Sequence, residues 1–167
     1  KEQPFPEDIA ILFAARALDR SVKWTGSRSE HFLGEAHARD AMMDAELALD
    51  AEGNFTALRV TLDEAMGAYY ACNGTGMPLR NFPNGLPLVY RTPIVDIDVR
   101  LVVTHNLSVG PYRGAGREQA SYVMERLVDQ AARETGHDPV ELRRQNMIPP
   151  GWMPYATPVG RTYDSGE

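Results

Sequence analysis

An arginine stands on each side of the segment Gly114-Ala115-Gly116, giving the run Arg113 to Arg117. Glycine has no Cβ atom, so the main chain at Gly114 and Gly116 can take conformations closed to other residues and can approach a bound group closely. An amphipathic pattern typical of a helix follows, and a helix N-terminus presents unpaired N–H groups and the positive end of its dipole. These residues predict a seat for an anionic ligand, such as a phosphate, a pyrophosphate or an anionic metal centre.

The same pattern also fits a purely structural role, because glycine-rich turns between a strand and a helix often serve only to close a tight connection. The segment does not match the phosphate-loop pattern G-x-x-x-x-G-K-[ST]. GAGREQA (114–120) has only two of the three glycines of the dinucleotide fingerprint. Spacing alone therefore leaves anion binding and packing about equally favoured, and it disfavours a nucleotide.

The composition is that of a soluble globular protein, and the 167 residues fit one domain that can bury roughly 70% of its unfolded surface. The net charge of -6 argues against a nucleic-acid-binding surface, which would carry a basic cluster. The chain has no apolar run long enough to cross a membrane, and its first residues, KEQPFPED, lack the form of a signal peptide. We expect a cytoplasmic protein with neither a nucleic acid nor a membrane as partner.

The side chains that could bind a metal directly are few. Cys72 is the single cysteine, and the spacing of His31, His37, His105 and His137 does not resemble a zinc site. We expect no metal site built from these side chains, and we expect Cys72 to be a small buried or half-buried thiol.

The helices and strands before the glycine segment are predicted from the spacing of apolar residues and from helix-capping residues. A buried helix is expected from Pro6, a short strand at 21–26, and a brief helix after the capping pattern Ser27 to Glu30. Alternating apolar and polar residues predict a hairpin of strands 43–49 and 58–62. Residues 71–86 are rich in Gly, Pro and Asn and predict a long surface loop.

Alternation returns at 95–103, which predicts a strand leading to the glycine segment. An apolar stripe from Ala120 to Ala131 predicts a helix that ends at Gly136, and Asp138-Pro139 begins another that Pro149 must end. Together these elements predict an α+β fold with a mixed or antiparallel sheet and helices packed mainly on one face, within a single domain, 1–167.

The run PYRGAGREQASYVMERLVDQAARETGHDPVELRRQNMIPP (111–150), with MPYATPVGRTYDSG (153–166), closely resembles the molybdenum-cofactor-binding large subunit of the xanthine dehydrogenase, aldehyde oxidase and aerobic carbon monoxide dehydrogenase family. ALDRSVKWTGSRSEHFLGEAHARD (17–40) and VYRTPIVDIDV (89–99) are also similar to segments of that family. The resemblance extends over essentially the whole chain and is strongest for the carbon monoxide dehydrogenase-like members with YRGAGR.

The resemblance implies a part of a molybdenum hydroxylase, in which water supplies the oxygen and electrons leave through iron–sulfur clusters and usually a flavin. The implied cofactor of the full enzyme is molybdenum-molybdopterin, in its cytosine dinucleotide form in a bacterium. The implied partners are the rest of the large subunit, the 2Fe-2S and FAD subunits or domains, and a small-molecule substrate.

The resemblance also implies site residues. The cofactor-binding loop would be Tyr112, Arg113, Gly114, Ala115, Gly116 and Arg117, with Arg113 touching the molybdenum centre. Ala115 and Glu2 would face the substrate, and Arg80 is a weaker candidate for the same pocket.

Two departures from the family narrow the expected activity. Gly114 stands where copper-containing carbon monoxide dehydrogenases have a cysteine, and Ala115 stands where xanthine-oxidising members have an aromatic residue. Aldehydes and N-heteroaromatic compounds are therefore the expected substrates.

The resemblance places the catalytic glutamate in a segment downstream of Tyr163-Asp164-Ser165-Gly166, so no catalytic residue is expected here. Both ends resemble cut ends, and we expect the isolated chain to be inactive and to bind no cofactor stably. The alternative is a stand-alone binding or interaction module whose glycine loop binds a phosphate or is purely structural.

Overall fold

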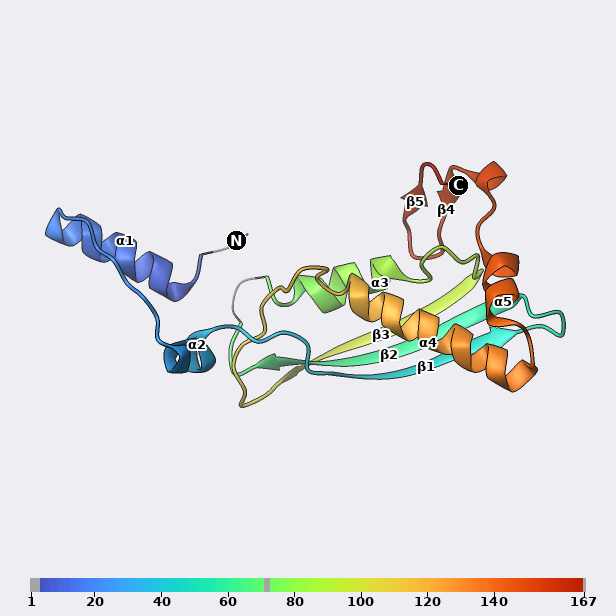
Figure 1. The fold of residues 1–167 in the computed structure, drawn as a ribbon, viewed down its shortest axis with the longest axis horizontal. Coiled ribbons are helices and arrows are strands. Elements are labelled where there is room, and N and C mark those ends of the chain that lie inside the picture. Colours follow the sequence, from blue (N-terminus) through green and yellow to red (C-terminus); the bar gives the residue numbers. More distant parts are fainter. Residues whose placement is uncertain (1–3, 71–72, 167) are drawn as a thin grey trace.

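A computed structural model describes residues 4–70 and 73–166 (Figure 1). Glu2 and Cys72 lie outside the described residues. The helices are α1 (Pro6–Leu18), α2 (Arg28–Gly34), the π-helical turn η1 (Met77–Asn81), α3 (Phe82–Gly85), α4 (Arg117–Thr135), α5 (Pro139–Asn146) and the short η2 (Pro150–Trp152). The strands are β1 (Ala41–Leu49), β2 (Phe55–Gly67), β3 (Ile94–Val103), β4 (Tyr155–Ala156) and β5 (Thr162–Tyr163).

The main sheet has the order β1-β2-β3, with β2 antiparallel to β1 and parallel to β3. The register pairs Leu47 with Leu58, and Leu58 in turn with Val95. The hairpin and the strand expected at 95–103 are both confirmed. The sheet is therefore mixed, and the α+β class is confirmed as well.

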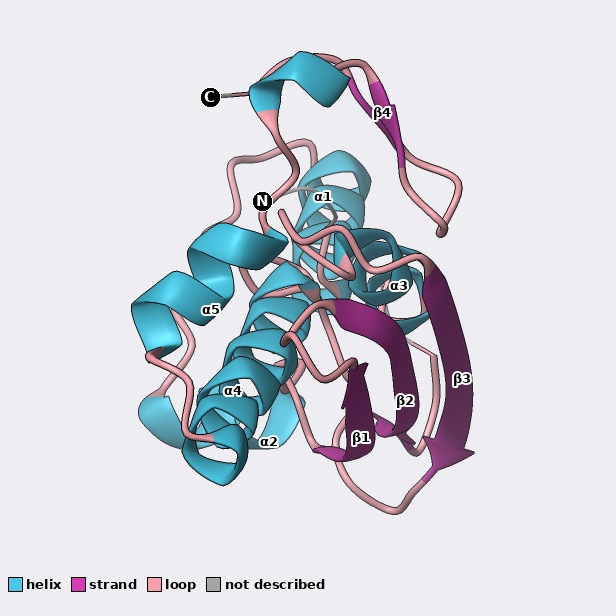
Figure 2. Ribbon diagram, turned by 90° about the vertical axis from the view of Figure 1, so that its right-hand side faces the viewer, coloured by secondary structure: helices cyan, strands magenta, loops and turns pink. Residues whose placement is uncertain are grey.

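One face of the sheet is covered and the other is open. Figure 2 shows α4 and α3 packed against the same face. The core between them is made by residues of the sheet, of α3 and of α4, including Leu58, Val60, Leu62, Phe82, Leu86, Met124 and Val128. The open face carries charged residues that pair across the strands, with Arg59 on Glu46 at 3.1 Å and Arg100 on Asp63 at 2.6 Å.

The helix caps match the sequence pattern. Ser27 accepts from the amide of Glu30, whose carboxylate accepts from the amide of Ser27. Asp138 caps α5 by accepting from two amides, and α4 ends at Gly136 in a left-handed conformation. The predicted end of α4 and start of α5 are thus confirmed, whereas α5 ends at Asn146, before Pro149.

Three expectations about the N-terminal half are wrong. No residue of α1 is buried, and α1 projects away from the sheet (Figure 1). Its apolar side chains find no covering element among the described residues. Residues 21–26 form no strand, because this segment, which connects α1 to α2, lies apart from the sheet (Figure 1) and pairs with no strand of the described residues.

The third wrong expectation is the surface loop at 71–86. Residues 77–85 are helical, with Met77 and Phe82 buried, and Leu86 is buried directly after them. The spacing of these apolar residues follows neither a strand nor a regular helix, so periodicity could not detect them. Pro78 and Pro83 each lie in the first turn of their short helix, where proline is tolerated.

Candidate functional site

The glycine loop lies at the end of the sheet where β2 and β3 finish. The segment before β1 reaches the same place, because the amide of His37 donates to the carbonyl of Ser108 at 2.8 Å. The amide of Gly110 donates back to the carbonyl of His37, also at 2.8 Å. This short parallel pairing brings residues 37–40 beside residues 109–113.

The loop backbone is left-handed at three consecutive residues, with φ of 101° at Gly114, 52° at Ala115 and 99° at Gly116. Two internal hydrogen bonds close it: Ala115 donates to the carbonyl of Tyr112 at 2.8 Å, and Arg117 donates to the carbonyl of Gly114 at 3.2 Å. Two of the amides that the sequence suggested for a ligand are therefore already paired within the loop.

Packing inside the chain accounts for both glycines. A Cβ atom on Gly116 would lie 2.8 Å from the carbonyl oxygen of Met77 and 3.2 Å from the amide of Phe82. A Cβ atom on Gly114 would overlap the carboxylate of Glu118. The glycines thus allow the loop to contact η1, α3 and the first turn of α4, which is the packing role left open by the sequence.

Glu118 takes the place expected for an anionic ligand. Its Oε1 atom accepts from the amide of Gly116 at 3.3 Å and forms an ion pair with Arg39. A carboxylate at this position also interacts favourably with the positive end of the α4 dipole. An external phosphate would have to displace Glu118, so the phosphate seat predicted from the helix N-terminus is filled by the chain itself.

Arg39 contacts the loop at two points and the first turn of α4 at a third. Besides its ion pair with Glu118, it donates to the carbonyl of Arg113 at 3.2 Å, and its guanidinium carbon lies 4.8 Å from the centre of the Tyr112 ring. The hydrogen bond to the carbonyl of Arg113 joins positions 74 residues apart in the sequence.

The remaining side chains of the loop face outward. Tyr112 is 63% exposed, and Arg113 and Arg117 are exposed too. Arg117 makes a long contact of 3.5 Å to the carbonyl of Gly114. Among the described residues, the guanidinium of Arg113 has no hydrogen bond or ion pair, so its charge is available to a bound group.

A buried carboxyl lies behind the loop. Glu64 in β2 is 1% exposed and accepts from the side-chain amide of Gln119 in α4 at 3.2 Å. Burial raises the pKa of Glu64, and the nearby carboxylates of Asp40 and Glu118 act in the same direction. The hydrogen bond from Gln119 and the charge of Arg39 oppose this shift.

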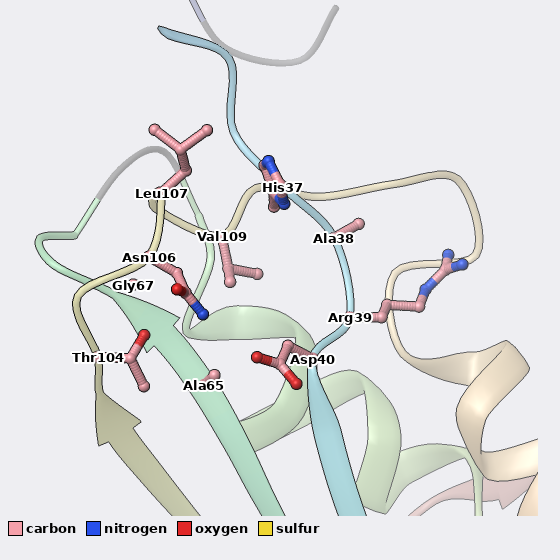
Figure 3. Close-up of a pocket in the computed structure, with 10 residues that line it drawn as sticks. All are labelled: His37, Ala38, Arg39, Asp40, Ala65, Gly67, Thr104, Asn106, Leu107 and Val109. Atoms are coloured by element: carbon pink, nitrogen blue, oxygen red, sulfur yellow. The ribbon is translucent and has the colours of Figure 1, made fainter. Parts of the chain in front are cut away.

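A cavity of about 310 Å³ opens at this end of the sheet (Figure 3). Its lining includes His37, Asp40, Thr104 and Asn106. In Figure 3 the side chain of Arg39 extends away from the cavity toward the loop, whereas Asp40 points inward. The hydroxyl of Thr104 is buried and has no hydrogen-bond partner in the described part of the chain.

The structure brings together Tyr112, Arg113, Gly114, Ala115, Gly116 and Arg117 as one loop. Arg80 is exposed in η1, the turn whose first carbonyl contacts Gly116. Within residues 4–70 and 73–166, no group of three or more His, Cys, Asp or Glu side chains could hold a metal ion. In the same residues, no helix is long and apolar enough to span a membrane.

Sequence reasoning missed the residues that support the loop. Glu118 could have been found, because an acidic residue in the first turn is a known signal at a helix N-terminus. Arg39, Glu64 and Gln119 carry no comparable signal, since each acts through a contact distant in sequence.

Comparison with known proteins gives a consistent picture. Residues 1–147 match the model of the molybdopterin cofactor-binding domain. The chain is 35% identical to the 6-hydroxypseudooxynicotine dehydrogenase complex subunit gamma of Paenarthrobacter nicotinovorans, over 98% of this chain and 21% of that protein. It is also 35% identical to the carbon monoxide dehydrogenase large chain of Hydrogenophaga pseudoflava, over 98% of this chain and 20% of that protein.

Among solved structures, quinoline 2-oxidoreductase from Pseudomonas putida 86 superposes with a TM-score of 0.86 at 34% identity, over 95% of this chain and 20% of that one. The chain thus spans about a fifth of the length of the relatives it matches.

Proposed function

The chain belongs to the family of molybdopterin cofactor-binding domains, and we propose that residues 112–117 form part of the cofactor site of a molybdenum hydroxylase large subunit. The observation that carries this proposal is the exposed guanidinium of Arg113, which has no partner within residues 4–70 and 73–166, on a loop whose backbone is fixed by its own neighbours. Molybdopterin is an anionic ligand, and an arginine is suited to binding phosphate or other oxyanion groups.

The geometry supports one way in which the loop would bind the cofactor. Because Glu118 fills the N-terminus of α4, the loop would offer the side chains of Arg113 and Arg117 rather than the helix N-terminus. Gly114 and Ala115 are only half-buried, so their main chain can still meet a flat group. These features fit a wall of a larger site better than a self-contained phosphate site.

The cofactor, when bound, supplies the redox chemistry of oxidative hydroxylation. The residues of this chain would bind and orient it. Arg113 would lie against the anionic metal centre and Tyr112 beside it. Ala115 would leave room for the substrate; Glu2, the other residue expected to face it, lies outside the described residues. No residue of this chain is assigned as catalytic base.

We propose an N-heteroaromatic substrate, with aldehydes as the second class. The names of two relatives reported above support this order, since they refer to quinoline and 6-hydroxypseudooxynicotine. The nicotine 6-hydroxylase large subunit of Paenarthrobacter nicotinovorans, which is 29% identical over 100% of this chain and 20% of that protein, supports it as well. Quinoline and nicotine both contain an aromatic ring with nitrogen. Other relatives are carbon monoxide dehydrogenases, but Gly114 offers no sulfur for a second metal.

The wider proposal follows from the fifth of the relatives' length that the chain spans. We propose that residues 1–167 are one domain of a larger subunit. That subunit would carry molybdenum-molybdopterin, in a bacterium as the cytosine dinucleotide form, and would pass electrons to 2Fe-2S and FAD partners in the cytoplasm. The isolated chain would be inactive, because one loop supplies few of the contacts that so large a ligand needs.

The test is the complete reading frame that contains this chain, expressed with cofactor maturation. Arg113→Ala and Arg113→Lys are compared with the parent for molybdenum and pterin content and for oxidation of quinoline, nicotine and an aromatic aldehyde with an artificial electron acceptor. Loss of a charge-assisted contact should lower turnover roughly 10- to 100-fold in Arg113→Ala, with smaller losses in Arg113→Lys.

The matched control is Arg133→Ala, an exposed arginine near the far end of α4. It should leave cofactor content and turnover unchanged. Parent-like cofactor content and turnover in Arg113→Ala would contradict the assignment of this loop.

A further inference from the structure

Arg39 differs from the other arginines near the site because it contacts two residues of the glycine loop, Tyr112 and Arg113, and also Glu118 in the first turn of α4. Its guanidinium pairs with Glu118, donates to the carbonyl of Arg113 at 3.2 Å and lies over the Tyr112 ring at 4.8 Å. We propose that Arg39 is the positioning residue of the cofactor loop, which holds residues 112–116 so that the side chain of Arg113 projects toward the cofactor. The inference rests on the proposed function and deepens it.

The backbone of Arg39 supports a specific role. Its φ of 64° is left-handed, a conformation that costs a residue with a Cβ atom roughly 1 kcal/mol or more. Such conformations persist where the surroundings fix them, and they are enriched at functional sites. The left-handed turn occurs directly before β1, where it sends the side chain toward the loop and away from the cavity (Figure 3).

Glu118, the ion-pair partner of Arg39, is also held in an energetically unfavourable arrangement. While its Oε1 atom bonds to Gly116 and Arg39, its Oε2 atom is buried with no hydrogen-bond partner in the part of the chain that the structure describes. A buried acceptor without a partner is destabilising. Arg39 and the amide of Gly116 are the groups that keep Glu118 in this position.

The chemistry of the contacts calls for arginine. A planar guanidinium can lie on an aromatic ring and still donate in its own plane to a carboxylate and a carbonyl. A lysine ammonium at the same position could pair with Glu118, but it could not make the three contacts together. Arg39→Lys is therefore a partial rather than a conservative replacement.

The position of Arg39 explains how it would act through the loop. It bonds to the main chain of Arg113 and not to its guanidinium, so the side chain of Arg113 is left unoccupied while its backbone is fixed. The contact of Gly116 with Met77 fixes the other end of the same loop. Removing Arg39 would free residues 112–114 but leave the anchor at Gly116 intact.

The experiment uses the complete protein with its cofactor and compares Arg39→Gln, Arg39→Lys, Glu118→Gln and the double variant Arg39→Gln/Glu118→Gln. Hydrogen–deuterium exchange of peptides that cover residues 112–118 reports the order of the loop. It is measured with the cofactor and after cofactor removal. Molybdenum content, kcat and KM are measured on the same preparations.

We expect hydrogen–deuterium exchange of residues 112–118 to become roughly 10-fold faster in Arg39→Gln. The increase in Arg39→Lys should be smaller. The double variant should be little worse than Arg39→Gln alone, because both substitutions break the same contact. kcat should fall about 10-fold while KM changes little, since the cofactor and not the substrate is displaced. Arg59→Gln, which loses ion pairs on the open face of the sheet, should change neither exchange nor kcat.

Parent-like exchange of the loop in Arg39→Gln would overturn the proposal whatever happens to activity. Faster exchange with an unchanged kcat would also overturn it. That result would mean that Arg39 orders the loop but that this order does not matter for the cofactor. Failure of the function assigned to the loop would appear elsewhere, as normal cofactor content and turnover in Arg113→Ala. The two proposals can therefore fail separately.

Discussion

The side chains of Glu64 and Gln119 are hydrogen-bonded at 3.2 Å inside the protein, where Glu64 is 1% exposed and Gln119 is 8% exposed. Glu64 belongs to the central strand β2, and Gln119 belongs to the first turn of α4. This bond joins the sheet to the helix that follows the glycine loop. A hydrogen bond to an ionised carboxylate is stronger than one to a neutral carboxyl, so the strength of this contact depends on the protonation of Glu64.

We predict that Glu64→Gln changes the pH dependence of stability. The pKa of Glu64 is raised in the folded protein, so above the ordinary value of 4.5 the folded state binds the proton more readily than the unfolded state. The free energy of unfolding should therefore fall as pH rises through the raised pKa. Glu64→Gln should remove this decline and raise the free energy of unfolding near neutral pH relative to the parent.

Urea unfolding of the 167-residue chain between about pH 4 and about pH 8 checks this prediction. Asp98→Asn, on the open face of the sheet, serves as control for the loss of one carboxylate. Equal pH slopes for the parent and Glu64→Gln would show that Glu64 titrates as in the unfolded chain.

Substitution of Asn146 should lower the free energy of unfolding more than substitution of most other polar residues. It is 1% exposed, accepts from the amide of Phe55 at 2.8 Å and donates to the carbonyl of Gly53 at 2.9 Å. Asn146→Ala leaves both backbone groups without a partner, and we expect a loss of about 2–4 kcal/mol in the free energy of unfolding. Denaturant unfolding should show less than about 0.5 kcal/mol for the exposed control Gln130→Ala; a similar small value for Asn146→Ala would contradict the prediction.

Gly116→Ala should disrupt the loop. The new Cβ atom would lie 2.8 Å from the main-chain oxygen of Met77, at a φ of 99° that alanine rarely takes. We expect a loss of at least about 2 kcal/mol and, in the complete protein, a loss of molybdenum content. Gly151→Ala is the matched control, because its Cβ atom would meet nothing within 4 Å. Equal melting temperatures for the two variants would show that the loop accommodates the Cβ atom of alanine without a loss of stability, which would contradict the prediction.

Polar substitutions in α1 should leave the chain as stable as before. Leu12 is 70% exposed and Phe13 is 73% exposed, so neither buries much apolar surface here. Leu12→Lys and Phe13→Ser should change the free energy of unfolding by less than about 0.5 kcal/mol. Met124→Ala in the core should cost about 2–5 kcal/mol in the same measurement. A loss from Leu12→Lys near that of Met124→Ala would mean that α1 packs on the body after all.

The fold could be predicted where neighbours in sequence are also neighbours in structure. The hairpin, the stripe of α4 and the caps at Ser27 and Asp138 all follow from periods of a few residues and from local hydrogen bonds. The helical turns at 77–85 could not be predicted this way, because their burial depends on packing against α4 and β2, whose residues are not their neighbours in sequence. The predicted burial of α1 was wrong for the same reason, because an apolar pattern does not say which surface, if any, covers the helix.

The amino-acid sequence by itself determined that Gly114 and Gly116 stand at the start of a helix, between two arginines, in a molybdopterin-family pattern. Only the tertiary structure decided that Glu118 fills the helix N-terminus and that Arg39 reaches Arg113 across 74 positions. The physical reason is that such contacts depend on the pairing of residue 37 with residue 109 at the end of the sheet. No local preference encodes that pairing, so the support of the loop becomes visible only once the strands are in register.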